Sequence, residues 1–248
     1  MAEKRRTVVV STNNNPDYYF YTPYIERAWN ILGWDLAILI TQDVDTKELL
    51  INNPDTMLMR IPEIKGLRSE TLAQGGRLYA ANYMSKDTFI MTSDMDMLPL
   101  SDYCKPKYED ITIHGHDLTD YTYYPMGYAA MNGHKWKEVM NLTGLTENDF
   151  ERDAKAQPIC YAPDWETWWN WDWRVLTDKL APYKKQIKFV PRGRREGEPF
   201  AFGRIDRGDS MKIIPGPWID AHCENNNVRH ESKLLRFLEI FEATYGKL

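Results

Sequence analysis

The sequence predicts an α/β fold, a largely parallel sheet flanked by helices, in a single domain spanning residues 1–248. Short apolar runs typical of buried strands alternate with longer segments of helical periodicity, and this alternation favours parallel pairing. The composition, 43% apolar and 27% charged, is that of an ordinary soluble globular protein. A chain of 248 residues buries roughly three quarters of its unfolded surface, so it can form a core without disulfides.

The first hundred residues contain four predicted strands and two predicted helices. The first helix opens with a proline, carries an apolar stripe at helical spacing and ends at Gly33. The second helix is expected to be capped by Ser69 and to turn Leu72, Gly76, Tyr79 and Tyr83 toward the sheet. The strands are predicted at residues 7–11, 34–41, 56–61 and 89–93, and the helices at residues 22–32 and 69–83.

The second half of the chain adds further strands and helices to this pattern. Residues 143–163 are polar and aperiodic, which predicts an irregular surface segment. A closing amphipathic helix from Leu234 to Tyr245 is expected to dock on the sheet or on a partner subunit. Strands are predicted at residues 111–117 and 187–190. From Tyr128 a strand is expected to lead into a helix that contains Trp136 and runs through Met140, and a further helix is expected to carry Asp172, Val175, Leu176 and Lys179 on one face.

Two carboxylates, Asp94 and Asp96, follow the apolar run that begins at Phe89. Side chains alternate along a strand, so the pair is predicted to leave one face where the strand ends, just before Pro99. Ligands of open α/β sheets bind at the carboxyl ends of strands, and Mg²⁺ or Mn²⁺ is commonly held by one or two carboxylates together with substrate phosphates. The pair therefore indicates a metal and diphosphate site.

The segment from Leu78 to Pro99, with its Asp94-Met95-Asp96 motif, resembles the central segment of the GT-A class of nucleotide-sugar glycosyltransferases. The resemblance implies a GT-A-like sheet, a Mn²⁺ or Mg²⁺ cofactor on Asp94 and Asp96, and a nucleoside diphosphate sugar as donor. It implies that residues up to about 100 bind the nucleotide and that residues from about 101 bind a glycan, protein or small-molecule acceptor. The donor-binding candidates that it suggests are Thr12, Asn13, Asn14, Arg77 and Asp94.

The resemblance also suggests roles in the second half of the chain. Asp172, in the first turn of a helix, is the preferred general base, with Glu166 and then Asp164 as its alternatives; if the reaction retains configuration, Asp172 becomes a positioning residue. His222 is the candidate third metal ligand. An Arg- and Gly-rich segment over residues 192–209, which includes Arg194, is predicted to be a mobile loop that closes over the donor diphosphate.

Charge and cysteine content exclude other classes of protein. A net charge of −5 argues against nucleic acid as a partner. The three cysteines are far apart and form no paired motif, which favours a reducing compartment, expected to be the cytoplasm. No apolar stretch is long enough to span a membrane. The oligomeric state is not indicated by any of these features.

Two alternative functions remain open at this point. The predicted strand at residues 111–117 ends in His114, His116 and Asp117, and together with the Asp pair these residues could form a metal-dependent hydrolase site. Five tryptophans lie within nine positions from Trp165 to Trp173, as in a noncatalytic carbohydrate-binding module.

Overall fold

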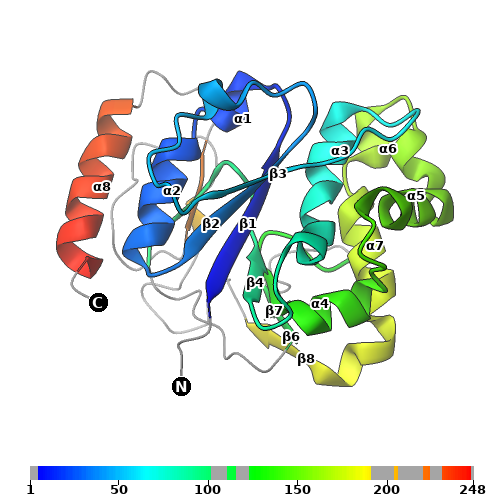
Figure 1. The fold of residues 1–248 in the computed structure, drawn as a ribbon. Coiled ribbons are helices and arrows are strands. Elements are labelled where there is room, and N and C mark those ends of the chain that lie inside the picture. Colours follow the sequence, from blue (N-terminus) through cyan, green and yellow to red (C-terminus); the bar gives the residue numbers. More distant parts are fainter. Residues whose placement is uncertain are drawn as a thin grey trace.

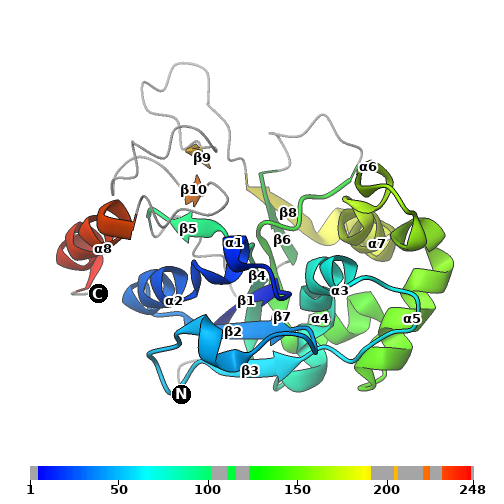
Figure 2. The ribbon, with the colours of Figure 1, turned by 90° about the horizontal axis from the view of Figure 1, so that it is seen from above.

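The computed structural model describes residues 5–101, 111–115, 123–190, 204–205, 220–223 and 231–246. Ten strands form two sheets within these residues (Figures 1 and 2). The larger has seven strands in the order β3-β2-β1-β4-β7-β6-β8, and the smaller has the order β5-β10-β9. The strands are β1 (Arg6–Thr12), β2 (Asp35–Ile40), β3 (Met57–Arg60), β4 (Phe89–Thr92), β5 (Met97–Pro99), β6 (Ile111–His114), β7 (Ala129–Asn132), β8 (Ile187–Val190), β9 (Arg204–Ile205) and β10 (Asp220–His222).

The larger sheet is mostly parallel. Strand β1 pairs in parallel with both β2 and β4, β2 pairs in parallel with β3, and β6 with β8. Only β7 among the seven runs against its neighbours, β4 and β6. This confirms the predicted α/β architecture. The pairing of β4 with β7 carries one sheet across residue 100, and the division into nucleotide-binding and acceptor-binding halves stays a prediction.

Helices cover both faces of the larger sheet because its central strands are apolar on both sides. Val8 and Val10 face one hydrophobic core, whereas Val9 faces the other. Helices α2 (Thr22–Ile31) and α8 (Glu231–Tyr245) cover the first face; α3 (Ser69–Gly76), α4 (Gly133–Met140), α5 (Thr146–Ala156) and α7 (Trp171–Leu180) cover the second (Figure 1).

The closing helix α8 lies beside α2 (Figures 1 and 2). Its predicted apolar stripe is buried, with Phe237 and Phe241 both in the core. The hydroxyl of Tyr24 on α2 donates a 2.9 Å hydrogen bond to Glu231 at the start of α8. The sequence predicted that this helix docks either on the sheet or on a partner subunit. In the structure it packs within its own chain, against α2 and the core on that face of the sheet.

The strand order changes direction between β1 and β4, which makes this place the topological switch point of the sheet. From β1 the chain passes through α2 to β2 on one side, whereas from β3 it returns through α3 to β4 on the other side of β1. Connections that leave adjacent parallel strands in opposite directions open a gap at the carboxyl ends of those strands, where open α/β sheets bind ligands. Thr12 ends β1 at this edge, and the Asp94-Met95-Asp96 segment follows β4.

The prediction of an irregular segment over residues 143–163 is wrong. Residues Thr146–Ala156 form helix α5, and a 3-10 helix spans Pro158–Tyr161. The inward face of α5 carries buried polar groups, Thr146, Asp149 and Asp153, beside Phe150 and Ala154. The helix therefore has one buried face, but the residues on that face are partly polar, so the sequence shows no helical repeat of apolar residues.

The helix after Ser69 also differs from its prediction. Helix α3 ends at Gly76 and continues as a 3-10 helix, η2 (Arg77–Tyr83). The tighter winding of a 3-10 helix shifts the angular position of its residues, and Tyr83 is 41% exposed instead of facing the sheet. The residue in the N-cap position is Arg68, and Ser69 is the first helical residue.

Two of the three cysteines lie within the described residues. The thiols of Cys160 and Cys223 are buried and form no disulfide, while Cys104 lies outside the described residues. In the part of the chain that the structure describes, none of the helices has both the length and the apolar character to cross a bilayer.

Candidate functional site

The Asp94-Met95-Asp96 segment forms a turn between two sheets. Strand β4 ends at Thr92, and β5 starts at Met97 as an edge of the smaller sheet. The amide of Met97 donates a 3.2 Å hydrogen bond to the carbonyl of Asp94 across this turn. The predicted geometry, two carboxylates on one face where a single strand ends, is therefore wrong, because β4 stops before Asp94; Pro99 is the last residue of the separate strand β5. Asp94 is 34% exposed, whereas Asp96 is buried.

Asp96 lies beside His222. Strands β5 and β10 pair antiparallel, with Met97 opposite His222, and the amide of Cys223 donates to the carbonyl of Asp96 at 2.8 Å. This register places Nε2 of His222 3.2 Å from Oδ2 of Asp96. Neighbouring ligands of an octahedral ion bound at about 2.1 Å lie about 3 Å apart, so these two atoms fit the coordination shell of one divalent ion.

Arg77 joins the Asp turn to helix α7. Its Nη1 donates to the carbonyl of Ser93 at 2.9 Å and to Oδ1 of Asp94, and its Nη2 donates to Oδ2 of Asp172 at 2.9 Å. Burial alone would lower the pKa of Arg77, but the two carboxylates raise it above its ordinary value. The guanidinium therefore stays charged and ties two carboxylates, 78 residues apart in sequence, to one cation.

Asp172 occupies the first turn of α7, as predicted, and is fully buried. Its Oδ1 accepts a 2.9 Å hydrogen bond from the amide of Trp173, and its Oδ2 accepts from Arg77. Burial raises the pKa of Asp172 to about 6 although Arg77 acts in the opposite direction, and the nearby Asp94 adds to the rise. At neutral pH the carboxylate is therefore mostly ionised, and no part of it is exposed.

The loop after β1 contributes three predicted donor-binding residues. The hydroxyl of Thr12 donates to the carbonyl of Asn13 at 3.0 Å, and the amide of Asn13 donates to Oγ of Ser69 at 3.2 Å. Both side chains are buried, whereas Asn14 is exposed. Asn13 therefore ties the loop to the start of α3, Thr12 bonds within the loop, and Asn14 is exposed.

Two solved structures share this architecture. The chain matches a crystal structure of the galactosyltransferase LgtC in complex with donor and acceptor sugar analogs, with a TM-score of 0.54 and 10% sequence identity over 96% of this chain and 95% of that one. It also matches an active-site mutant of LgtC, with a TM-score of 0.52 and 12% identity over 98% of this chain and all of the other. The chain has the fold of LgtC. This confirms the predicted GT-A-like fold, and at such low identity the likeness extends to the fold alone.

Sequence comparison adds no further relative: no family model and no curated protein matches the chain. In this LgtC-like fold, the Asp turn, Arg77 and Asp172 lie along one edge of the sheet, and β10 brings His222 to the same turn. The contact between Arg77 and Asp172 was not predicted. No sequence signal could have found it, because it depends on how α7 docks against η2.

Several predicted residues cannot be placed or lie apart from this cluster. Arg194, His116 and Asp117 lie outside the described residues, and Glu166 belongs to the short helix α6 (Trp165–Trp168) with its side chain likewise outside them. His114, at the end of β6, is buried with its ring edge-to-face on Tyr128 at 6.0 Å. In the tryptophan segment, Trp168 and Trp171 are buried and Trp169 is 42% exposed.

An open groove of about 800 Å³ lies away from these residues, between α2 and the segment before β3. Its charged side chains are paired within the protein: Arg27 binds Glu242, and Glu26 accepts from the amide of Asn52 at 2.9 Å and from the hydroxyl of Thr56 at 2.6 Å. The pair of Arg27 and Glu242 therefore joins α2 to α8, and the groove shares no residue with the Asp turn.

Proposed function

We propose that the chain is a metal-dependent glycosyltransferase that moves a sugar from a nucleoside diphosphate sugar to an acceptor hydroxyl. The observation that carries the proposal is the cluster of Asp94, Asp96, Arg77, Asp172 and His222 at the ligand-binding edge of the sheet. The same fold in LgtC accommodates donor and acceptor sugar analogs. The acceptor in this proposal is a hydroxyl group of a glycan, a protein or a small molecule.

Asp94, Asp96 and His222 would hold Mn²⁺ or Mg²⁺. A shell that includes an imidazole nitrogen suits Mn²⁺ better than Mg²⁺, which prefers oxygen ligands. Asp96 and His222 are the close pair, whereas no group of three carboxylate, imidazole or thiolate side chains among the described residues is close enough to hold an ion, so the three proposed ligands do not form a complete site by themselves. We propose that the donor diphosphate completes the shell. The bound ion would neutralise the charge that develops on the nucleoside diphosphate leaving group.

We assign Asp172 a positioning role. A general base must reach the acceptor hydroxyl directly or through one water, and Asp172 has no exposed surface. Instead it holds Arg77, and Arg77 fixes the orientation of the Asp94 carboxylate. Glu166, on the helix before α7, is then the candidate base if the reaction inverts configuration.

The remaining donor contacts follow from position. The loop after β1, with Asn14 exposed at its surface, would receive the base and ribose beside β4. The Arg-rich segment that contains Arg194 would bind the diphosphate, since arginine forks match phosphate oxygens.

The decisive test is a thermal-shift panel of nucleoside diphosphates with and without Mn²⁺. One nucleotide should stabilise the protein only when Mn²⁺ is present; a ligand at 100 times its dissociation constant adds about 2.7 kcal/mol to the free energy of unfolding. Asp96→Asn should abolish this shift because it removes one ligand charge. Asp149→Asn replaces a buried carboxylate on α5 whose partners are Arg152, Asn82 and Thr143, and this variant should keep the thermal shift.

Two outcomes would refute the proposal. One is the absence of a metal-dependent shift with every nucleotide. The other is an unchanged shift in Asp96→Asn, which would remove the Asp turn from nucleotide binding.

A further inference from the structure

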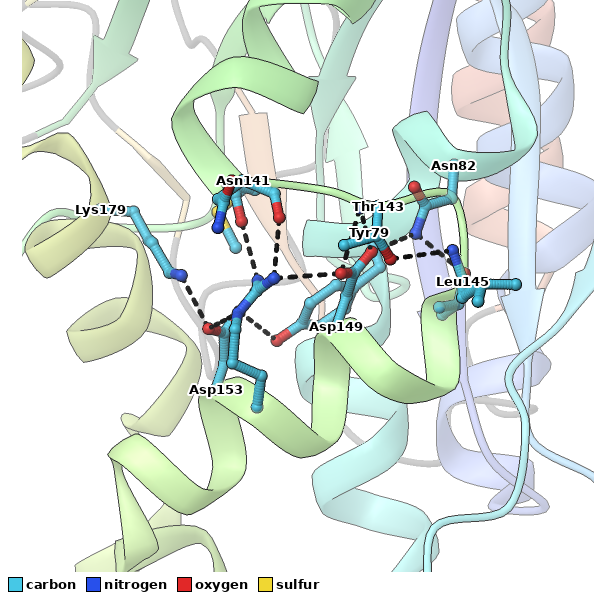
Figure 3. A network of polar contacts seen from close by, with 11 residues as sticks. Tyr79, Asn82, Asn141, Thr143, Leu145, Asp149, Asp153 and Lys179 are labelled. Carbon is cyan, nitrogen blue, oxygen red and sulfur yellow. Dashed lines mark hydrogen bonds and ion pairs between the residues drawn. The ribbon is translucent and has the colours of Figure 1, made fainter.

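Helix α5 carries a buried polar network that faces η2 and α7 (Figure 3). Asp149 and Asp153 are buried on its inner face, and Arg152 pairs with both at 3.0 Å. The guanidinium of Arg152 also donates to the carbonyls of Met140 and Asn141 at the end of α4. The network therefore fixes α5 against the neighbouring helices by charge and hydrogen bonds, in addition to the apolar contacts of Phe150 and Ala154.

Asp153 connects the two elements that carry Arg77 and Asp172. Its Oδ2 accepts from the hydroxyl of Tyr79 on η2 at 3.2 Å, and its Oδ1 lies 2.7 Å from Nζ of Lys179 on α7 (Figure 3). Tyr79 follows Arg77 by two residues. Lys179 follows Asp172 by seven residues, about two helical turns, so both lie on the same side of α7.

Aromatic stacking supports the same spacing. The ring of Phe150 on α5 stacks on Tyr79 and on Trp171. The distances between ring centroids are 4.8 Å and 5.1 Å. Trp171 directly precedes Asp172, and its Nε1 donates to the carbonyl of Gln157 just after α5, at 3.1 Å. Phe150 of α5 thus packs between Tyr79, two residues after Arg77, and Trp171, the residue before Asp172.

We propose that Asp153 is a positioning residue: through Tyr79 and Lys179 it sets the separation of η2 and α7, and so holds Arg77 within reach of Asp172 and Asp94. The consequence for catalysis rests on the proposed function, since it matters only if Asp94 binds the metal and donor. The consequence for the geometry of Arg77 does not.

Asp149 provides a matched control on the same helix. It is as buried as Asp153 and shares Arg152 with it. It also accepts hydrogen bonds from the side-chain amide of Asn82 at 3.0 Å and from the backbone amide of Thr143 at 2.9 Å, and neither residue belongs to α7. Asp149→Asn should therefore cost stability without loosening the link between η2 and α7.

The first arm of the test observes Arg77 directly. Guanidinium NH₂ protons exchange rapidly with water unless they are held in hydrogen bonds, so nitrogen-edited NMR at low temperature should show protected Nη signals of Arg77, assigned by their loss in Arg77→Lys. Asp153→Asn should broaden or remove these signals, and Asp149→Asn should keep them. Retained signals in a folded Asp153→Asn protein would overturn the proposal.

The second arm measures the Mn²⁺ concentration that half-saturates nucleotide binding, by calorimetry. A poorly oriented Asp94 binds metal less well, and loss of outer partners of a metal site typically costs at least tenfold in metal affinity. Asp153→Asn should raise this concentration about tenfold, whereas Asp149→Asn should leave it within about twofold. Equal increases in the two variants would reduce Asp153 to a stabilising residue. If the wild-type protein binds no nucleotide with Mn²⁺, the proposed function fails and the NMR arm still decides the role of Asp153.

A second pair of variants covers the case in which Asp153→Asn does not fold. Lys179→Met removes only the α7 side of the link, from a side chain that is partly exposed. Lys155→Met removes an ion pair of α5 that stays within the helix, to Glu151. Loss of the Arg77 signals in Lys179→Met but not in Lys155→Met supports the proposal, and retention in both overturns it.

Discussion

Two arginines in this protein each bridge a pair of carboxylates, and their surroundings differ. On α5, Arg152 joins Asp149 and Asp153, which are both buried and accept further hydrogen bonds or ion pairs from the protein. At the sheet edge, Arg77 joins buried Asp172 to Asp94, which is one third exposed. A carboxylate enclosed by protein donors stabilises the fold, whereas one that keeps solvent-facing surface beside a buried cation can still take a ligand.

The largest expected effect separates the two bridges by stability. Arg77→Met should cost about 3–5 kcal/mol in the free energy of unfolding, because it removes the cation beside Asp172 and leaves a buried charge that accepts from the backbone amide of Trp173. Arg152→Met should cost less, about 1–3 kcal/mol, because Asp149 and Asp153 keep other donors. Urea unfolding of both variants at pH 7 measures the difference.

Metal-dependent nucleotide binding should differ between these two variants more than their stability does. Arg77→Met is expected to lose metal-dependent nucleotide binding, and Arg152→Met to retain it. If Arg77→Met loses less free energy of unfolding than Arg152→Met, then removing the cation at the sheet edge costs no more than removing the one on α5. That result would contradict the comparison.

The next effect is a pH dependence that belongs to the sheet-edge bridge. The pKa of Asp172 is raised to about 6 in the folded protein, mainly by burial, above an unfolded value of about 3.9. Between these values the folded state binds more protons, so this carboxyl group lowers the free energy of unfolding as pH rises from 4 to 6. The two-unit shift corresponds to about 3 kcal/mol.

Asp172→Asn should remove this component. The stability of the variant relative to wild type should therefore increase by about 2 kcal/mol between pH 4 and pH 7, since the unfolded carboxyl is already about half ionised at pH 4. Repeating the urea titrations in 0.5 M NaCl provides the control, because salt screens exposed charges and affects a buried pair much less. A difference between the two proteins that is flat across this pH range would contradict the assignment.

The smallest expected effect concerns packing behind the bridge. A Cβ on Gly75 would overlap the ring of Trp171 and lie 3.0 Å from Phe150, so Gly75→Ala should cost about 1–3 kcal/mol by overpacking. Displacing Trp171 should also shift Asp172 and reduce turnover. Gly144→Ala is the control: its φ of +92° disfavours alanine, but nothing lies within 4 Å of the new Cβ. It should lose stability without losing turnover, as measured by thermal unfolding and initial rates.

Local sequence patterns predicted most of the strands and helices of the sheet. Runs such as Val8 to Val10 predicted strands that are buried on both faces, and the stripe from Leu234 to Tyr245 predicted helix α8. The position of Asp172 in the first turn of a helix followed from local periodicity as well. These features could be predicted because burial repeats along the chain with the period of the element that carries it.

Helix α5 escaped prediction because the groups on its inner face are polar. Asp149 and Asp153 occupy buried positions that apolar residues usually fill, and their partners come from η2, α4 and α7. Local sequence contains no record of those partners. A polar residue looks like a surface residue until the element that satisfies it is in place.

Only the tertiary structure decided which side chains meet at the site. The pairing of β5 with β10 brings His222 to Asp96, and the docking of α7 against η2 brings Asp172 to Arg77. It also placed the Asp pair in a turn between two sheets instead of on one strand face. The physical reason is that local periodicity reports how a segment is buried, whereas contacts between distant residues depend on strand order and helix packing, which are settled only when the whole core forms.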